Sequence, residues 1–304
     1  MSQALKNVII IGAGGNLGPV LVKAIDSEPS LNLSILSRES SKSTFPSHVK
    51  VHTVPDSYPA EALVAAFKGQ DAVVDLAPHY LVDEHKAFID AAVKVGVKRF
   101  LGPEFGGKTG EPRVVETVPL FKGKRDVVEY LISKESEGLT WTGVLTGGFF
   151  DWALKNQFLG FDLKAHKALI YDDGTAESDF TILSDIGNAT VGVLLHPAET
   201  VNKYVNVNTF HTSQKAILSA LQEATGEKWT LDHVNAKQAN EDGNAKIAKG
   251  DFSGAAPAIM GFQLGGHEWA HQYGTDNQLL LGRGTRSEKE LQEVVAKVVK
   301  GEEV

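Results

Sequence analysis

A glycine-rich turn between an apolar run and a helix-length segment limits what this chain can fold into more than any other feature. Residues 8–11 are a continuous apolar run, as expected for a strand that is covered on both faces. The turn Gly12-Ala13-Gly14-Gly15-Asn16-Leu17-Gly18 follows, and the pattern predicts a helix from about residue 16 to residue 26. A strand, a tight turn and a helix in this order are typical of the first unit of a parallel sheet.

The same alternation of strands and helices continues to about residue 150. We predict strands at 32–36, 49–54, 72–76, 98–101 and 140–145, and helices at 59–68, 83–95 and 119–136. Parallel strands joined by right-handed helical crossovers form a doubly wound, Rossmann-type α/β sheet. We therefore assign residues 1–150 to one domain of this class.

Residues 151–304 follow a less regular pattern. We predict strands at 168–171, 204–207 and 230–234, and helices at 185–195, 213–225, 235–249 and 288–300. We expect this part to add the last one or two strands to the sheet. The remainder should form a smaller α/β lobe at the C-terminal side, intertwined with the first domain, where a substrate would bind.

The spacing of the glycines indicates a dinucleotide site. Gly12 allows the tight turn, Gly15 lets the backbone approach a pyrophosphate, and Gly18 permits close packing of the helix on the sheet. The start of the helix offers free N–H groups and a positive dipole end to phosphates. A plain structural connection is the alternative. The contacts predicted for this turn are those of Gly12, Gly14, Gly15, Asn16, Leu17 and Gly18.

The end of the second strand favours NADPH over NADH. An acidic residue at this point would bind the ribose 2′-hydroxyl, whereas an arginine suits the 2′-phosphate. Arg38 can stack on the adenine and pair with the phosphate, and Lys42 can add a charge. Glu39 argues mildly against this assignment, and both cations could instead be solvated loop residues. We predict NADPH/NADP⁺ as the cofactor.

A lysine on the helix before the sixth strand is the candidate catalytic residue. A Tyr-x-x-x-Lys pair occurs at Tyr130 and Lys134, but Lys134 lies in the last turns of the helix, away from the ligand-binding edge of the sheet. Lys124 lies ten residues earlier, or about 15 Å up the helix at 1.5 Å per residue, and so reaches that edge. The alternative is a surface lysine that balances Asp126 and Glu129.

Several motifs together resemble the NmrA-like, isoflavone reductase-like family of atypical short-chain dehydrogenases/reductases, in particular its fungal members. The resemblance spans most of the chain and is strongest up to Phe150. The motifs are Gly12-x-x-Gly15-x-x-Gly18, Arg38, Arg99-Phe100-Leu101-Gly102-Pro103-Glu104-Phe105-Gly106, Phe121-Lys122-Gly123-Lys124, Gly148-Phe149 and Asp185-Ile186-Gly187. Plant members typically read Pro-Ser-Glu-Phe-Gly at residues 102–106, so the resemblance implies cofactor binding and does not extend to their phenylpropanoid substrate.

By this resemblance, Lys124 would bind the nicotinamide ribose and act as general acid or base. One lineage of the family keeps this lysine without its tyrosine. Burial beside a cofactor would lower the pKa of the amine toward a useful range. We further expect residues after the fourth, fifth and sixth strands to contact the cofactor, namely Pro78, His79, Pro103, Phe105, Gly148 and Phe149.

Aromatic residues and histidines are candidates for a substrate pocket. His79 could donate a proton in place of the absent tyrosine, or be an ordinary loop histidine. Phe149, Phe150 and Trp152 could wall an apolar pocket or pack in the core. We expect His267 and Trp269 to line the substrate cleft. The sequence His267-Glu268-Trp269-Ala270-His271 resembles a zinc motif, but the glycines around it disfavour the helix that this motif needs.

Composition narrows the choice of partners. A net charge of −8 argues against nucleic acid, and the absence of cysteine excludes thiolate metal sites and cysteine nucleophiles. No apolar stretch approaches the roughly 20 residues that span a bilayer, and the start of the chain does not resemble a signal peptide. We expect a cytoplasmic protein that binds no metal, is a monomer or homodimer, and takes a small aromatic molecule as its partner.

Two functions fit these features. The first is an NADPH-dependent reductase of a small aromatic or conjugated metabolite, acting on a carbonyl, an imine or an activated double bond. The second is a regulator that senses NADP(H), binds a protein partner and catalyses nothing. Lys124 favours the enzyme, because a sensor generally needs no lysine aimed at the cofactor.

Overall fold

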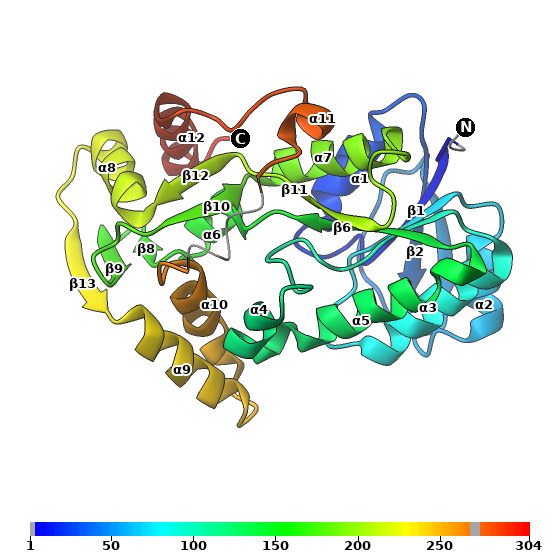
Figure 1. The fold of residues 1–304 in the computed structure, drawn as a ribbon. Coiled ribbons are helices and arrows are strands. Elements are labelled where there is room, and N and C mark those ends of the chain that lie inside the picture. The colour runs from blue at the N-terminus through cyan, green and yellow to red at the C-terminus, as the bar shows by residue number, and fades with distance from the viewer. Residues whose placement is uncertain (1–3, 268–273) are drawn as a thin grey trace.

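The computed structural model describes residues 4–267 and 274–304 of the chain. Its largest element is a seven-stranded parallel sheet in the order β11-β6-β5-β4-β1-β2-β3 (Figure 1). The strands are β1 (Asn7–Ile11), β2 (Asn32–Arg38), β3 (Lys50–Val54), β4 (Ala72–Asp75), β5 (Arg99–Leu101), β6 (Thr140–Leu145) and β11 (Lys203–Asn206). The predicted Rossmann-type fold is confirmed.

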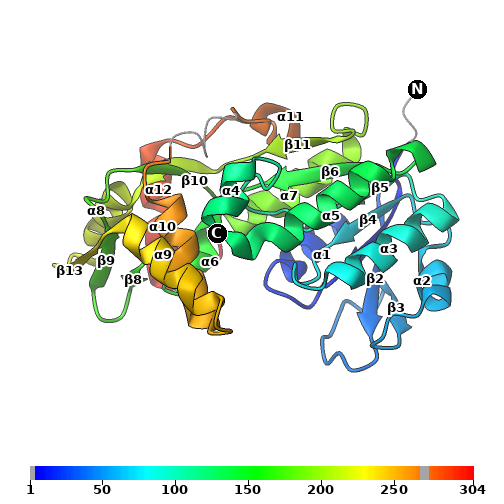
Figure 2. The ribbon, with the colours of Figure 1, turned by 60° about the horizontal axis from the view of Figure 1, so that its bottom comes forward.

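Helices cover both faces of this sheet, as the alternation of buried side chains along β1 requires. Val8 and Ile10 pack into one core, and Ile9 and Ile11 into another. The first core lies under α1 (Gly18–Asp26), α7 (Leu183–Leu195) and α11 (Asn277–Leu281). The second lies under α2 (Ala60–Phe67), α3 (Val82–Val95) and α5 (Lys122–Ser133), which run side by side in Figures 1 and 2.

Residues after β6 form two small sheets beside the main one. One contains β7 (Gly148–Phe149), β10 (Glu177–Thr181) and β12 (Phe210–Ser213), and the other β8 (Phe161–Asp162), β9 (Lys167–Tyr171) and β13 (Thr230–Val234). A third core lies between these sheets and their helices. The helices of this region are α6 (Phe150–Lys155), α8 (Gln214–Thr225), α9 (Ala236–Ile247), α10 (Ala255–Gln263) and α12 (Glu288–Lys300).

The chain returns to the main sheet after it has entered this second region. Strand β11 pairs with β6, and α7 packs against α1. Among the described residues, no helix is long and apolar enough to cross a membrane.

Two predicted helices of the first domain differ in extent from those in the structure. The first helix begins at Gly18, because residues 14–17 remain in the turn. The single helix predicted over 119–136 is divided into a 3₁₀ turn at Pro119–Phe121, α5, and a second 3₁₀ turn at Glu135–Glu137 that ends at Gly138, whose φ is +91°. A further short helix, α4 (Pro112–Thr117), precedes them. Our prediction also missed β7, β8, β10, β12, α6, α10 and α11, which are short or lack a regular apolar period.

Candidate active site

The glycine-rich turn exposes its backbone beside the start of α1. Gly12 adopts φ +76°, and a Cβ there would lie 2.7 Å from the backbone carbon of Leu76. Gly14, Gly15 and Asn16 are exposed, and no side chain caps α1. Gly18 N–H already donates to the carbonyl oxygen of Gly15, and Pro19 has no N–H, so a ligand here would meet the exposed backbone of residues 14–16 and the positive end of the helix.

Gly18 has a different task from the one predicted. A Cβ on Gly18 would lie 2.0 Å from the carbonyl oxygen of Ala13, which belongs to the same turn. Gly18 thus lets the turn close on itself. We expected glycine here because the helix packs closely on the sheet, but the atoms nearest to a Cβ on Gly18 belong to Ala13 in the turn.

Two cations stand beside this turn. Arg38 is the last residue of β2, and Lys42 follows in the loop; both are exposed. Neither forms an ion pair with a carboxylate in the described part of the chain. The same loop approaches the turn, since a Cβ on Gly14 would lie 2.1 Å from Ser43 Oγ. The loop therefore brings positive charge near the exposed backbone of the turn.

A cavity opens where β4, β5, β6 and β11 end. It has a volume of about 1190 Å³ including its open mouth. The residues that follow these strands form its walls together with α4, the 3₁₀ turn at Pro119–Phe121, α5, α6, α10 and β10. They include His79, Phe105, Lys108, Leu120, Phe121, Lys124, Leu145, Gly148, Phe149, Trp152, Phe158, Asp179, Asn206, Ile259, Met260, Phe262 and Gln263. Carboxyl ends of parallel strands are where open α/β sheets bind ligands.

Lys124 points from the first turns of α5 toward this cavity. Its Nζ donates a hydrogen bond to the backbone carbonyl oxygen of Glu104 at 2.5 Å, and it lies 5.4 Å from the centre of the Phe121 ring. Burial lowers the pKa of Lys124, although the nearby Glu104 carboxylate acts in the opposite direction. The alternative of a surface lysine does not apply, because Asp126 pairs with Lys122 and Glu129 with Arg125.

The turn after β5 fixes the partner of Lys124. Phe105 has φ +26°, an uncommon conformation for a residue other than glycine. The neighbouring Glu104 side chain is fully buried and accepts a hydrogen bond from Thr109 Oγ1 at 2.7 Å. Burial raises the pKa of Glu104, and Lys124 and Thr109 partly counter this effect. A buried carboxyl group and a partly buried amine therefore share one site, where each affects the other's protonation.

His79 also lines the cavity, on the segment after β4. Its Nε2 is buried without a hydrogen-bond partner in the described structure. Burial, helped by the positive charges of Lys124 and His85, lowers the pKa of His79 to about 4. His79 is thus a neutral imidazole at neutral pH. Its neighbour Tyr80 is 68% exposed, and the two rings lie edge to face with their centroids 5.9 Å apart.

A buried Asp75–His85 pair holds the segment that carries His79. His85 Nδ1 lies 2.6 Å from Asp75 Oδ2, and its Nε2 lies 3.1 Å from the carbonyl oxygen of Pro78. Both partners can only accept, so both ring nitrogens of His85 carry a proton. Burial alone would lower the pKa of His85, but the Asp75 carboxylate and the Pro78 carbonyl raise it. This charged pair anchors Pro78 next to the cavity.

Tyr130 and Lys134 lie away from the cavity, as predicted from their place on the helix. The hydroxyl of Tyr130 donates to Asp90 Oδ1 at 2.7 Å, and Lys134 pairs with Asp90 and Glu137. These contacts lie on the outer surface of α3 and α5. They make the literal Tyr-x-x-x-Lys match a structural cluster.

Adjacent aromatic residues after β6 take opposite directions. Phe149 and Trp152 line the cavity. Phe150, which we also expected in the pocket wall, is instead fully buried in the core beside Phe180 and Phe210. The reason is local, because Phe149 ends the short strand β7 and Phe150 begins α6.

The predicted contribution of residues 267–271 is described only in part. His267 stacks on Phe262, a cavity residue, with ring centroids 5.6 Å apart. Trp269 and His271 lie outside the described residues. Within residues 4–267 and 274–304, no group of three or more histidine, aspartate or glutamate side chains could hold a metal ion.

The remaining residues that we predicted to contact the cofactor differ in how far they are exposed. Leu17 and Pro103 are buried, whereas Pro78 is exposed. Gly148 lines the cavity and leaves room for its neighbours, since a Cβ there would lie 2.9 Å from both Gln263 Nε2 and the Phe180 ring.

Sequence reasoning missed the side of the cavity that α4, α10 and β10 form. Val114 and Phe262 pack together in a small separate core. Asn240 and Asn244 on α9 both donate to the carbonyl oxygen of Thr117, at 3.1 and 2.8 Å. This wall is formed by segments that are distant in sequence, so it could not be predicted from local patterns. The short polar strand β10, which carries Asp179, also lacks the regular spacing of apolar residues by which strands are predicted.

Comparisons with known proteins agree with this geometry. The model of the NmrA-like family matches residues 4–248. "Oxidoreductase aprR" of Aspergillus flavus is 38% identical over 300 residues, which cover 97% of this chain and 99% of that protein. "Oxidoreductase poxI" of Penicillium oxalicum is 34% identical over 241 residues, which cover 78% of this chain and 76% of that protein.

A solved structure shares the fold over nearly the whole length. The complex of leucoanthocyanidin reductase with NADPH from Vitis vinifera superimposes with a TM-score of 0.76 at 20% sequence identity, and the match covers 97% of this chain and 99% of that one.

Proposed function

The chain belongs to the NmrA-like family and is an oxidoreductase, and on this premise we propose that it reduces a small aromatic or conjugated metabolite with NADPH. The reduced group would be a carbonyl, an imine or an activated double bond. One observation carries the proposal. Lys124, whose pKa burial lowers, lies in a mainly apolar cavity beside an open dinucleotide turn.

The residues around the glycine-rich turn fit such a cofactor. The exposed backbone at Gly14 and Gly15 and the uncapped start of α1 would receive the pyrophosphate. Arg38 and Lys42, which no carboxylate neutralises among the described residues, would face the 2′-phosphate. The contact of Gly12 with Leu76 joins this turn to the segment that carries His79. The turn and the segment that leads into the cavity are therefore neighbours.

Lys124 would hold the nicotinamide ribose and deliver the proton. When bound, NADPH supplies the hydride. The hydrogen bond to the Glu104 carbonyl occupies one N–H of Lys124 and leaves two to face the ligands. Burial lowers the pKa of Lys124, so the ammonium gives up its proton more readily than a lysine in water.

His79 would assist in its neutral form. With a pKa of about 4 it carries no ionic charge near neutral pH, so it is no source of an acidic proton from an imidazolium. Its buried Nε2 has no partner in the described structure and can form one hydrogen bond to a bound ligand. We assign the proton transfer to Lys124 and an orienting hydrogen bond to His79.

The cavity wall supports an aromatic substrate. Phe149, Trp152, Phe158 and Phe262 supply flat apolar surface, and few polar groups interrupt it. A planar conjugated molecule would lie against these rings with its reducible group toward Lys124.

Stopped-flow oxidation of NADPH with a panel of aromatic ketones, imines and enones tests the proposal. We expect Lys124→Ala to lower kcat by about 10²- to 10⁴-fold, the usual contribution of a positioned acid, and to leave NADPH affinity within a few-fold. In the wild type, kcat should fall as pH rises through the lowered pKa of Lys124, because the ammonium is the active form.

Lys122→Ala is the matched control. Lys122 lies two residues away, and its partner is Asp126 on the surface. Its loss should leave kcat unchanged. Full activity of Lys124→Ala would contradict the assigned role. Tight NADPH binding without oxidation by any member of the panel would contradict the substrate class.

A further inference from the structure

The part of the cavity wall that β10 provides carries a carboxylate that the proposed reduction does not use. Asp179 lines the cavity and is only 6% exposed. Removal of a carboxylate from water costs free energy unless hydrogen bonds compensate for it. The arrangement of those hydrogen bonds therefore indicates what the group can still do.

All hydrogen bonds to the Asp179 side chain within the described structure reach one oxygen. Oδ1 accepts from Asn208 Nδ2 at 2.8 Å and from His211 Nδ1 at 2.9 Å. Oδ2 has no partner among the described residues. An ionised carboxylate has capacity for about four hydrogen bonds, so Asp179 keeps acceptor capacity on its second oxygen.

The strand register fixes the direction of this side chain. Asp179 on β10 lies opposite His211 on β12, so the two side chains share one face of the small sheet. The next residue, Phe180, faces the other way into the core against Phe150. Asp179 therefore cannot turn toward the core without displacing its partners.

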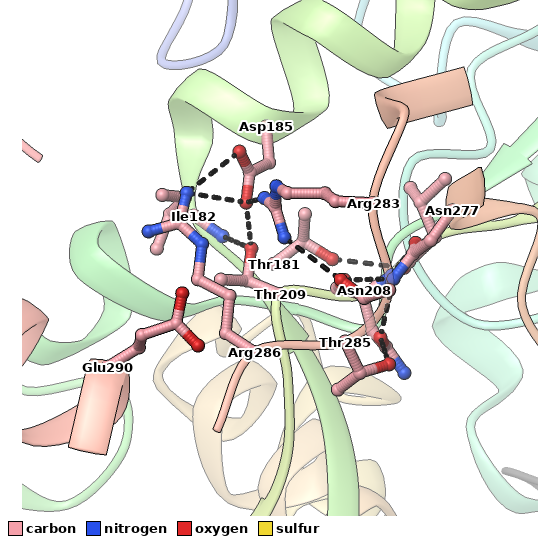
Figure 3. A network of polar contacts seen from close by, with 12 residues as sticks. Thr181, Ile182, Asp185, Asn208, Thr209, Asn277, Arg283, Thr285, Arg286 and Glu290 are labelled. Atoms are coloured by element: carbon pink, nitrogen blue, oxygen red, sulfur yellow. Dashed lines mark hydrogen bonds and ion pairs between the residues drawn. The ribbon is translucent and has the colours of Figure 1, made fainter. Parts of the chain in front are cut away.

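A second layer of contacts holds Asn208 in place. The side-chain oxygen of Asn208 accepts from Thr285 Oγ1 at 2.6 Å and from Asn277 Nδ2 at 3.1 Å, and its backbone N–H donates to Asn277 Oδ1 at 3.1 Å. Because its oxygen is occupied, its NH₂ group must point to Asp179. Figure 3 shows this cluster around Asn208.

The segment that carries Thr285 is anchored by the buried carboxylate of Asp185. Arg283 and Arg286 both pair with Asp185, which also accepts a hydrogen bond from Thr209 at 2.5 Å (Figure 3). Asp185 lies at the start of α7, on the main body of the protein. The Asp179 carboxylate is thus fixed before any ligand arrives, which reduces the entropic cost of binding.

The surroundings of Asp179 favour a ligand with one polar end. Phe149, Trp152 and Met260 make most of the remaining cavity apolar. An aromatic molecule that brings a hydroxyl or amino hydrogen to Oδ2 would satisfy the carboxylate. The same molecule without a donor would leave the carboxylate desolvated and unpaired, which disfavours its binding.

We propose that Asp179 determines specificity by accepting a hydrogen bond from a hydroxyl or amino group on the ring of the substrate, so that the enzyme selects ring-hydroxylated or ring-amino compounds. This rests on the proposed function, because it names the class of molecule that the same cavity would reduce. Asp179 acts here on binding, and Lys124 keeps the proton transfer.

Calorimetric titration of the NADP⁺ complex with matched ketones tests the inference without any turnover. The probes are 3- and 4-hydroxyacetophenone, the two amino analogues, and the two fluoro analogues, which match the hydroxyl in size but donate nothing. We expect the better-fitting hydroxyl or amino isomer to bind about 10- to 100-fold more tightly than its fluoro analogue, as a hydrogen bond to a charged acceptor implies. Hydroxyl and amino probes that differ from each other would identify the preferred donor.

Asp179→Ala should reduce this ratio to about one, mainly because the fluoro ketone binds better. Asp232→Ala is the matched control, since Asp232 is an exposed carboxylate on β13, a strand outside the cavity lining, and its loss should leave the ratio unchanged. Unaltered NADP⁺ affinity and thermal unfolding would show that the variants are folded. If Asp179→Ala does not fold, Asp179→Asn replaces it and should lower the ratio several-fold.

Equal binding of hydroxyl and fluoro ketones to the wild type overturns the inference, as does a ratio that survives in Asp179→Ala. Failure of every ketone to bind while NADP⁺ binds also overturns it. A clear ratio in binding without oxidation of NADPH supports the role of Asp179 and contradicts the proposed reduction, so the two failures are distinct.

Discussion

The two sides of the site are built by different means. The side formed by the glycine-rich turn consists of backbone, since Gly12 and Gly18 are required by contacts with backbone atoms of Leu76 and Ala13. The cavity side consists of side chains from α4, α6, α10 and β10, which are distant in sequence. A backbone site tolerates few substitutions, whereas a side-chain wall can change residue by residue. The former suits a constant cofactor and the latter a variable substrate.

We expect the largest effect, on the free energy of unfolding, from substitution of the adjacent residues Phe149 and Phe150. Phe150→Ala should lower the free energy of unfolding by about 3–5 kcal/mol, because it empties a fully buried site. Phe149→Ala should cost much less stability and raise the Kd of an aromatic ketone. Urea unfolding followed by tryptophan fluorescence, with calorimetry for the ketone, measures both. A greater loss of stability in Phe149→Ala would break the division between core and wall.

The identity of the cofactor gives the next largest effect. Arg38→Ala should weaken NADPH binding by about 1.5–3 kcal/mol, or roughly 10- to 100-fold, through loss of a charge-assisted hydrogen bond. NADH, which lacks the 2′-phosphate, should bind almost as before. Fluorescence titration of both cofactors provides the measurement. Lys50→Ala, which removes an exposed cation at the far end of β3, is the control. Equal losses of affinity for NADPH and NADH would contradict the assignment of Arg38 to the 2′-phosphate.

Substitutions of two glycines in the turn should have different effects, one on the stability of the fold and the other on cofactor binding. Gly18→Ala should destabilise the fold by about 1–3 kcal/mol, because the new methyl group meets the Ala13 carbonyl. Gly15→Ala should be almost neutral in stability, since its nearest neighbour would be 3.4 Å away, yet it should weaken NADPH binding. Thermal unfolding and cofactor titration of the two variants check this. The reverse pattern would show that Gly15 is structural.

The smallest effect concerns the buried Asp75–His85 pair. Asp75 and Pro78 raise the pKa of His85 in the folded protein against the effect of burial. The resulting stabilisation is complete below the unfolded pKa of about 6.5 and is lost as pH rises through the higher folded value. The free energy of unfolding, measured from pH 6 upward, should therefore decline. His85→Gln should flatten this part of the curve, and an unchanged slope would exclude the ion pair as its cause.

The sequence predicts the cofactor side far better than the substrate side, for a physical reason. The strand before Gly12 and the position of Lys124 follow from local periodicity and from the rise of a helix, so both can be worked out along the chain. Phe149 and Phe150 are identical neighbours, and only the junction of β7 and α6 separates their directions. Asp179 acquires its place through Asn208 and His211, which are distant partners in sequence.

The return of the chain to the main sheet has a consequence for biosynthesis. While the protein emerges from the ribosome, β6 is an edge strand with an open row of backbone groups until Lys203–Asn206 arrive to pair with it. Asn206 is in turn held by Asp276, so this edge is secured only when the C-terminal part has been made. We therefore expect the nascent chain to be most prone to aggregation before this pairing is made. A fragment cut at residue 150 would lack this pairing.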